Sequence, residues 1–283
     1  MTDAPSNPSM SALDDYILGR TSDEYQRLRH QAKIWEAATK RILQQAGLKE
    51  GMNCIDIGCG PGEVMRLMGE MVGPTGCVTG LDSDGKIGRE AVDVLRATTK
   101  CEFSFIEHDI ESIEEADGAP FDVTFARLVL IHVRDPIAVL RKMNSWTKPG
   151  GYIIVQDYDL RTIDMYPRLR ALDEFEKVLL GGVEKIGRDA RIGYKLPTYF
   201  AEAGIGSPDG TDVTGVIGSM QQYGPIVQAT YRSLLTRAIQ MSLTTERESE
   251  EFFKEMNDAA DSEQYYSIMM PLLIGVWKRK AYN

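Results

Sequence analysis

The stretch Ile55-Asp56-Ile57-Gly58-Cys59-Gly60-Pro61-Gly62 joins a short apolar run to a segment with helical periodicity. Glycines in such a turn let a ligand approach the backbone, and the N-terminus of the following helix offers free N–H groups. Dinucleotide-binding turns share this architecture but space their glycines as GxGxxG, whereas the spacing here is GxGxG. Asp56 would repel a pyrophosphate and attract a ligand that carries ammonium and sulfonium groups. The turn therefore favours S-adenosylmethionine (SAM) over NAD as the ligand.

From residue 53 to residue 156 the chain alternates apolar runs with segments of helical periodicity. The apolar runs cover residues 54–57, 77–81, 103–106, 122–126 and 152–155. Apolar side chains recur between the runs at helical spacing, as in Val64, Met65, Met68 and Met71. Glycine and proline turns at 73–76 and 148–151 end helices and begin strands. This alternation predicts a parallel α/β sheet.

Helical additions are expected on both sides of this core. Before it, Tyr25, Leu28, Ala32, Trp35 and Ile42 share one helical face that Gly47 ends, which gives a helix that packs on the core or closes over it as a lid. After the core, we expect helices over 169–186 and 195–203, a strand over 212–217, a helical stretch over 225–261 and a last strand over 268–276. The segment between the last two strands spans roughly 50 residues, too long for a hairpin loop, and predicts a cap over a site.

The composition is that of a globular chain and limits its partners. The 283 residues are 43% hydrophobic, which excludes a mainly disordered protein. Lys plus Arg number 32 and Asp plus Glu number 42, so the net charge of −10 disfavours nucleic acid and anionic membranes. No apolar stretch reaches the roughly 20 residues of a membrane span, the first residues do not resemble an export signal, and the four cysteines are scattered. We therefore expect a cytoplasmic protein without a membrane or nucleic-acid partner.

Two further acids follow predicted strands. Asp82 ends the second apolar run, where a carboxylate can accept hydrogen bonds from both hydroxyls of a ribose. Asp109, after the third run, can accept from an exocyclic adenine amine, and Ile110 beside it offers an apolar contact for the ring. Asp109 could equally cap the turn that follows it.

With these residues in place, the region from Tyr16 to Val155 resembles a class I SAM-dependent methyltransferase. The resemblance runs through the glycine turn with Asp56, then Asp82, Asp109-Ile110, the segment 121–132 and the Lys148-Pro149-Gly150-Gly151 turn. It implies a Rossmann-like α/β fold: a seven-stranded, mostly parallel sheet with the last strand antiparallel, an N-terminal helical lid and helical cap insertions. The corresponding parts are a flexible tail (1–14), the lid (15–48), the SAM-binding core (49–160) and a C-terminal part with the substrate cap and the last two strands (161–283).

The same resemblance implies a set of SAM-binding residues. In the family the residue after the fourth strand, here Arg127, touches the methionine part of SAM, and the leading helix closes over the cofactor. The predicted cofactor site comprises Tyr16, Tyr25, Gln31, Asp56, Gly58, Cys59, Gly60, Asp82, Ser83, Asp109, Ile110 and Arg127. Cys59 enters this set simply as a small side chain between the glycines.

Methyl transfer from a sulfonium mainly requires alignment of donor and acceptor in a dry site, because the leaving group is already activated. A base is needed if the acceptor must lose a proton, and His132, in the helix expected after the fourth strand, is the best-placed histidine. Asp157 and Tyr158 follow the fifth strand and could orient a substrate amine or hydroxyl. His132 could instead only hydrogen-bond the scaffold, and residues 157–159 could instead form a solvated loop. No catalytic metal is expected, because Ala126-Arg127 occupies the point where metal-dependent relatives place an acid.

The sequence therefore predicts a methyltransferase that acts on O, N or C of a small molecule. Apolar residues of the expected cap favour a hydrophobic or aromatic acceptor: Met220, Tyr223, Tyr231, Leu234, Leu235, Met241, Phe252, Phe253 and Met256. A SAM-binding protein without methyl transfer and an NAD-dependent oxidoreductase stay open as alternatives. A homodimer is compatible with the sequence.

Overall fold

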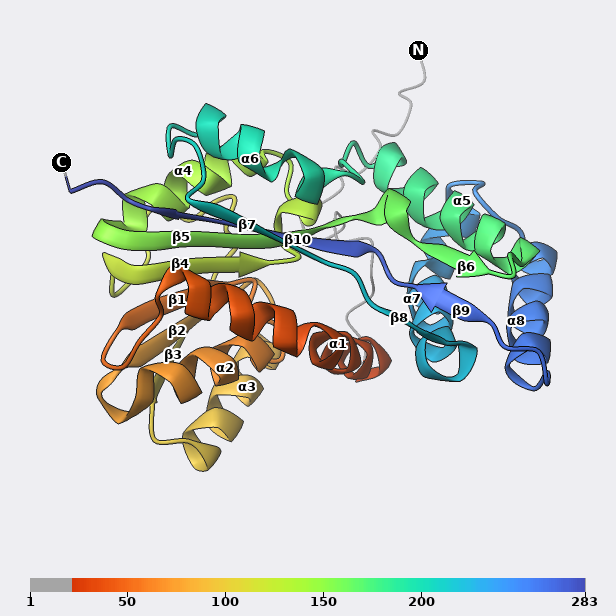
Figure 1. Ribbon diagram of the computed structural model, residues 1–283, viewed down its shortest axis with the longest axis horizontal. Helices are drawn as coiled ribbons and strands as arrows, with labels where there is room; N and C mark the ends of the chain where they lie inside the picture. The colour runs from red at the N-terminus through yellow and green to blue at the C-terminus, as the bar shows by residue number, and fades with distance from the viewer. Residues whose placement is uncertain (1–21, 283) are drawn as a thin grey trace, which may run out of the picture.

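The computed structural model describes residues 22–282, and a seven-stranded sheet lies at its centre (Figure 1). The strand order is β3-β2-β1-β4-β5-β10-β7, in which β10 runs antiparallel to both of its neighbours. The strands are β1 (Asn53–Ile57), β2 (Cys77–Asp82), β3 (Glu102–Glu107), β4 (Phe121–Arg127), β5 (Thr147–Asp159), β7 (Gly210–Thr214) and β10 (Leu272–Arg279). The strand order reverses between β1 and β4, the position at which open α/β sheets bind ligands. The expected fold class is confirmed.

Helices cover both faces of this sheet. Figure 1 shows α1 (Ser22–Ala46), α2 (Glu63–Val72) and α3 (Gly85–Thr98) on one face, with α4 (Pro136–Trp146) and α6 (Ile192–Glu202) on the other. Successive strand residues point to opposite faces, so Cys54 and Ile154 join one buried apolar cluster while Ile55 and Ile153 join the other. The double covering explains why the strands read as continuous apolar runs.

A cap lies beyond the carboxyl ends of the parallel strands. Its helices α5 (Arg170–Lys185), α7 (Met220–Gln240) and α8 (Glu246–Ala260) pack on one another. A three-stranded sheet made of β6 (Asp164–Tyr166), β9 (Ser267–Met269) and β8 (Ile217–Ser219) adjoins them. The rings of Tyr231 and Phe252 stack inside the cap with their centroids 3.9 Å apart. The cap thus covers the edge of the sheet at which a ligand site is expected.

Three elements expected from the sequence are interrupted, and those expectations were wrong in extent. The helical stretch over 225–261 breaks into α7 and α8, where Ser242 adopts a left-handed backbone and the Thr245 side chain caps α8. The strand over 212–217 divides into β7 and β8, and the last strand divides into β9 and β10 at Pro271, which has no N–H for a ladder. For both strands, one half stays in the large sheet and the other joins the small sheet of the cap.

The leading helix α1 connects the core to the cap. It contacts α2, β5 and β10 of the core and α7 of the cap. The helix ends as expected at Gly47, whose φ of 91° suits a glycine, and Leu48 N–H donates back to the Leu43 carbonyl. Within residues 22–282, no helix is both long and apolar enough to cross a membrane.

Candidate active site

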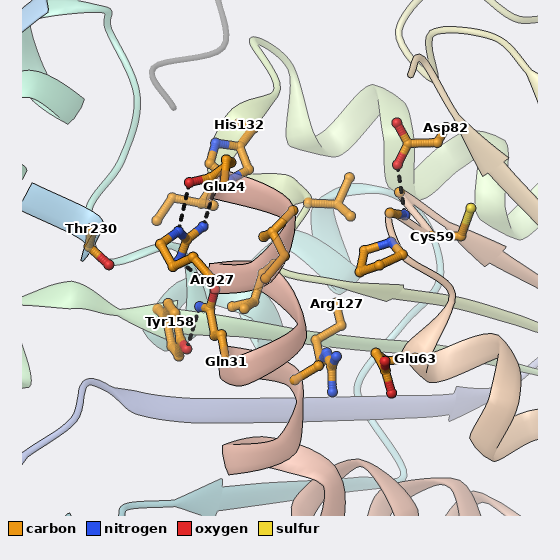
Figure 2. Close-up of a pocket in the computed structure, with 18 of the residues that line it drawn as sticks. Glu24, Arg27, Gln31, Cys59, Glu63, Asp82, Arg127, His132, Tyr158 and Thr230 are labelled. Atoms are coloured by element: carbon orange, nitrogen blue, oxygen red, sulfur yellow. Dashed lines mark hydrogen bonds and ion pairs between the residues drawn. The ribbon is translucent and has the colours of Figure 1, made fainter. Parts of the chain in front are cut away.

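A cavity of about 350 Å³ opens between the carboxyl edge of the sheet, the N-terminal half of α1 and the cap (Figure 2). Asp82 and Cys59 lie at one end of the view, and Tyr158 and Thr230 lie at the other. The walls therefore come from segments far apart in the sequence: the glycine turn, the ends of β2, β4 and β5, the lid helix, and helices α5 and α7.

The glycine turn brings bare backbone to the cavity wall. The N–H groups of Gly58 and Cys59 donate to the Leu81 carbonyl, at 2.7 and 3.1 Å, which fixes the turn against β2. Gly60 has a φ of 46°, and a Cβ built on it would meet no atom within 4 Å. Open space next to a left-handed glycine leaves room for a ligand to lie against the backbone.

Asp82 is held rigidly at the end of β2. One carboxylate oxygen accepts from Gly60 N–H and the other from Asp84 N–H, both at 2.9 Å. Asp84 in turn accepts from the Tyr25 hydroxyl of the lid helix. A carboxylate oxygen can accept more than one hydrogen bond, so Asp82 is oriented by the turn while it still offers lone pairs to a diol.

Asp56 is buried without a full set of partners. One of its carboxylate oxygens makes no hydrogen bond to any described residue. Burial raises the pKa of Asp56 to about 8, opposed by the positive charge of Arg127 and reinforced by Asp82. A buried carboxylate that lacks a donor is costly unless a ligand supplies one. Its position on the cavity wall suits a cationic group of a ligand.

Arg127 joins the lid to the sheet beside Asp56. Its guanidinium donates to the Thr39 hydroxyl of α1 at 2.9 Å, and that hydroxyl donates to the Gln156 side chain at 2.8 Å. At the edge next to Asp82, Asp109 accepts from Glu111 N–H at 2.8 Å, and Ile110 lies beside it on the wall. The expected turn-capping role of Asp109 is thus present together with its position at the cavity.

The chemistry of this end fits SAM. It offers an unpaired buried carboxylate for a cation, a fixed carboxylate for a diol, and an acid next to an apolar side chain for an adenine. The open backbone at Gly60 gives the ligand room without a clash. A pyrophosphate would instead meet the acids Asp82 and Asp109.

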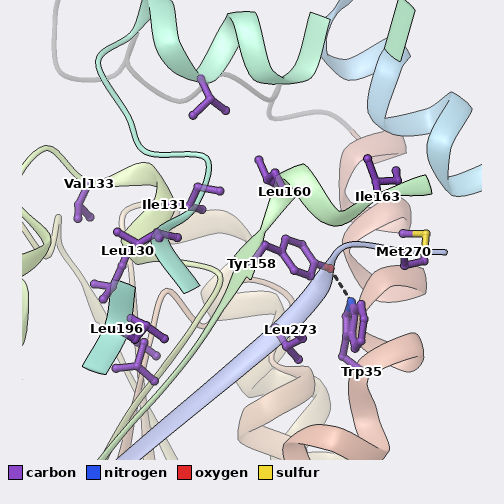
Figure 3. Close-up of a cluster of buried hydrophobic side chains, with 14 of the residues drawn as sticks. Trp35, Leu130, Ile131, Val133, Tyr158, Leu160, Ile163, Leu196, Met270 and Leu273 are labelled. Carbon is purple, nitrogen blue, oxygen red and sulfur yellow. Dashed lines mark hydrogen bonds between the residues drawn. The ribbon is translucent and has the colours of Figure 1, made fainter. Parts of the chain in front are cut away.

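The other end of the cavity is largely apolar. Its walls come from the turns after β4 and β5 and from the cap, with side chains such as Ile131, Leu160, Ile163, Phe175, Leu179, Val183, Ile226, Val227, Leu234 and Met270. Figure 3 shows several of these around Tyr158 and Trp35. A second, polar wall faces them from the lid helix, where a Glu24–Arg27 ion pair is almost fully buried. Such a mixture of apolar surface and a few fixed polar groups is typical of a small-molecule site.

His132 lies on the cavity wall in a short 3₁₀ turn, Leu130–His132, and not in the helix that was expected to hold it. Burial lowers the pKa of His132 to about 4, and the charges of Arg27 and Arg188 lower it further. The imidazole is therefore neutral at pH 7, and its protonated form is disfavoured. A general base must stabilise the proton that it receives, so this environment works against a base role.

Asp157 and Tyr158 point to different sides of β5. Residues 157–159 are buried within β5, so the alternative of a solvated loop is wrong. Asp157 is absent from the cavity wall, and its carboxylate accepts from Ile131 N–H and Tyr158 N–H. Burial raises the pKa of Asp157 to about 7, while these backbone donors lower it. Tyr158 lies on the wall and accepts hydrogen bonds from Gln31 and Trp35. Asp157 thus shapes the turn that carries His132, and Tyr158 faces the cavity.

The cavity collects most of the residues predicted from the sequence. Those on its wall are Tyr25, Gln31, Asp56, Gly58, Cys59, Gly60, Asp82, Ser83, Asp109, Ile110, Arg127, His132 and Tyr158. Tyr16 lies outside the described residues. Of the apolar cap residues named from the sequence, Leu234 reaches the wall, whereas Tyr231 and Phe252 stack on each other in the cap core.

Sequence reasoning missed Glu24 and Arg27. Both are charged residues on the same helical face as Leu28 and Ala32, at a spacing that allows an ion pair. Two charged residues on an otherwise apolar helical face could have indicated a buried ion pair there. Within residues 22–282 there is no group of three or more His, Cys, Asp or Glu side chains arranged to hold a metal ion.

Comparison with known proteins agrees with this geometry. Residues 25–187 match the family described as Methyltransferase domain. The chain is 30% identical over 183 residues to an uncharacterised 37.1 kDa protein in transposon Tn4556 of Streptomyces fradiae, covering 64% of this chain and 51% of that protein. It is also 27% identical over 164 residues to demethylmenaquinone methyltransferase of Staphylococcus aureus. That match covers 55% of this chain and 64% of the relative. The matches thus span about half to two thirds of the length of these relatives.

A solved structure shares the fold. A Bacillus halodurans protein assigned as a methyltransferase superposes with a TM-score of 0.59 and 17% identity, covering 87% of this chain and 99% of that one. The sheet order and the site define a class I SAM-binding α/β protein. Since the family match covers more than half of the chain, the chain belongs to the methyltransferase domain family. Its cofactor is SAM, and the NAD-dependent alternative is set aside.

Proposed function

We propose that the protein transfers the methyl group of SAM to a small, largely apolar molecule held between the lid helix and the cap. The observation that carries this proposal is one continuous cavity with two chemically different ends. One end carries the acids and the glycine turn that suit SAM, and the other carries apolar side chains of α5 and α7. A reaction between two bound molecules needs such neighbouring subsites.

At the cofactor end, each residue would have a separate task. Asp82 would accept hydrogen bonds from the ribose hydroxyls, and Asp109 with Ile110 would hold the adenine. Asp56 would face the cationic methionine part, with Arg127 and the glycine turn beside it. Bound there, SAM supplies an activated methyl group, so the protein's own contribution is alignment and the exclusion of water.

At the acceptor end, the apolar wall favours a hydrophobic or aromatic molecule. Phe175, Leu179 and Val183 of α5 and Ile226 and Val227 of α7 line this part of the cavity. The Staphylococcus aureus relative is named for a reaction on demethylmenaquinone, which supports an apolar acceptor without identifying it. The low pKa of His132 favours an acceptor that reacts without proton removal by this histidine.

The test is methyl transfer itself. Purified protein is incubated with SAM labelled in its methyl group and with a panel of small aromatic and polyketide-like acceptors. Labelled product that requires intact Asp82 is the expected result. Binding of SAM without transfer to any acceptor would instead indicate a SAM-binding protein that does not methylate.

A further inference from the structure

A chain of buried and partly buried hydrogen bonds crosses the polar wall of the acceptor end (Figure 2). The Arg27 guanidinium donates to the Gln31 side-chain oxygen at 2.8 Å. The Gln31 amide nitrogen donates to the Tyr158 hydroxyl oxygen, also at 2.8 Å. The Trp35 indole N–H donates to that same oxygen from the next turn of α1 (Figure 3). Two successive turns of the lid helix thus donate to the hydroxyl at the end of β5, and Arg27, one turn earlier, orients Gln31.

Arg27 and Trp35, at the two ends of this series of hydrogen bonds, fix the donor and the acceptor of every bond between them. An arginine guanidinium can only donate, so the Gln31 oxygen must face Arg27 and the Gln31 nitrogen must face Tyr158. The Trp35 indole likewise can only donate. The Tyr158 oxygen is therefore an acceptor in both of its bonds to the lid. The hydroxyl hydrogen is left over, because no described acceptor lies within hydrogen-bond distance of it.

We propose that Tyr158 is a specificity-determining residue that donates its hydroxyl hydrogen to an oxygen lone pair of the methyl acceptor. The inference rests on the proposed function and specifies that the protein donates a hydrogen bond to the acceptor here. The matching acceptor is an apolar molecule with a carbonyl, phenolate or similar oxygen, because a positively charged ammonium group has no lone pair to offer. Tyr158 stands at the end of the cavity away from Asp82, so its partner is the acceptor and not the ribose of SAM.

The surroundings keep this hydroxyl protonated. Burial raises the pKa of Tyr158 to about 12, opposed by the hydrogen bonds from Gln31 and Trp35. The ring is 7% exposed and packs edge-on against Trp35, with centroids 5.7 Å apart. A neutral, rigid donor in an apolar cavity discriminates between ligands with and without an oxygen, since a buried donor left unpaired is costly.

Two probes of nearly the same shape test the proposal without knowledge of the natural substrate. 1-Tetralone carries a carbonyl oxygen, and tetralin has the same two-ring skeleton without it. Both are titrated by calorimetry into the protein saturated with S-adenosylhomocysteine, the demethylated product of SAM. The wild type should prefer 1-tetralone by about fivefold beyond any preference shown by a Tyr158→Phe variant.

Two further variants separate a donor from a structural residue. Gln31→Glu keeps an oxygen for Arg27 but removes the N–H, so the Tyr158 hydroxyl turns to donate to the new carboxylate. This variant should lose the preference for 1-tetralone although Tyr158 is present. Tyr152→Phe, on the same strand but off the cavity wall, is the matched control and should keep it. The affinity for S-adenosylhomocysteine should stay within about twofold in the Tyr158→Phe and Tyr152→Phe variants.

The possible failures are distinguishable. An unchanged preference in Tyr158→Phe, or equal binding of both probes by the wild type, would overturn the proposal while leaving the apolar cavity in place. A Tyr158→Phe variant that weakens S-adenosylhomocysteine instead would assign the hydroxyl to the cofactor and overturn it as well. Binding of S-adenosylhomocysteine with neither probe would contradict the acceptor site itself, and with it the proposed function.

Discussion

Asp56 and Asp82 are acids on neighbouring strands that differ in how many hydrogen bonds their carboxyl groups accept from the described residues. Asp82 receives two backbone donors, whereas one oxygen of Asp56 receives none from the described residues. The first is thereby positioned, and the second is left in a state that a cationic ligand would improve. Functional sites often hold such groups at a cost to stability. The two acids lead to different predictions.

Replacing Asp82 by alanine should weaken SAM binding by about 1.5 to 3 kcal/mol, because charge-assisted hydrogen bonds to the ribose are lost. Calorimetric titration with SAM measures the change. Asp122→Ala is the matched control, since Asp122 also accepts from a backbone N–H, that of Asn53, but at the opposite edge of the sheet. Equal losses in the two variants would remove the ribose assignment.

Replacing Asp56 by asparagine should stabilise the ligand-free protein at neutral pH. Below pH 3.8 the carboxyl is protonated in both folded and unfolded chains. Between 3.8 and about 8 the unfolded chain gives up the proton while the folded chain keeps it, so the wild type loses stability as the pH rises. The asparagine variant avoids this loss, by about 2 to 5 kcal/mol at pH 8.

Thermal unfolding at pH 5 and pH 8 checks this prediction. The difference in Tm between Asp56→Asn and wild type should grow with pH, and the variant should bind SAM more weakly. Asp122→Asn breaks an ion pair with Lys148 and should give no such gain. A Tm advantage that shrinks as the pH rises would show that Asp56 is not held in an unfavourable state.

The lid helix α1 is the element on which the site depends most. It supplies Tyr25 beside Asp84, Gln31 and Trp35 beside Tyr158, and Thr39 beside Arg127. The sequence predicted this helix and its apolar face correctly. It did not reveal which polar residues of the helix would face which strand end, since that depends on how α1 crosses the sheet.

Glu24→Ala should loosen the N-terminal half of α1. The Glu24 carboxylate accepts from Arg27 and from Ser233 of α7, so its loss removes one partner of a buried ion pair and a hydrogen bond to the cap. Removing one partner of a buried pair costs about 3 to 5 kcal/mol. Hydrogen exchange over residues 24–35 should accelerate accordingly.

A surface pair on the same helix gives the comparison. Arg41 pairs with Asp212 of β7 and is 42% exposed, so Arg41→Ala should cost less than about 1 kcal/mol. If hydrogen exchange over residues 24–35 were unchanged in both Glu24→Ala and Arg41→Ala, the Glu24–Arg27 pair would not hold the lid in place.

At the scale of the whole molecule, the sequence predicted the sheet well and the cap poorly. The strands β1, β2, β4 and β5 have apolar runs buried on both faces, and that pattern depends on local residues. The breaks at Ser242 and Pro271 and the pairing of β6, β9 and β8 depend on contacts between distant segments. The apolar end of the cavity is lined by α5, α7 and the break at Pro271, and which of their side chains face it depends on how the cap packs on the sheet, so this lining could not be derived from the sequence.

The arrangement as a whole puts the polar end of the cavity, where we propose that SAM binds, and its apolar end, where we propose that the acceptor binds, under α1. Both ends share α1, which contacts the core and the cap. Occupation of the cofactor end should therefore order the lid and prepare the acceptor end, an effect that hydrogen exchange of α1 with and without S-adenosylhomocysteine would detect as slower exchange.

The most direct test of the central claim is calorimetric titration of the purified protein with SAM, S-adenosylhomocysteine and NADH in parallel. We predict micromolar binding of SAM and of S-adenosylhomocysteine at a single site and no binding of NADH. Binding of NADH without either SAM compound would contradict the assignment of Asp56 and the glycine turn, and with it the proposed methyl transfer.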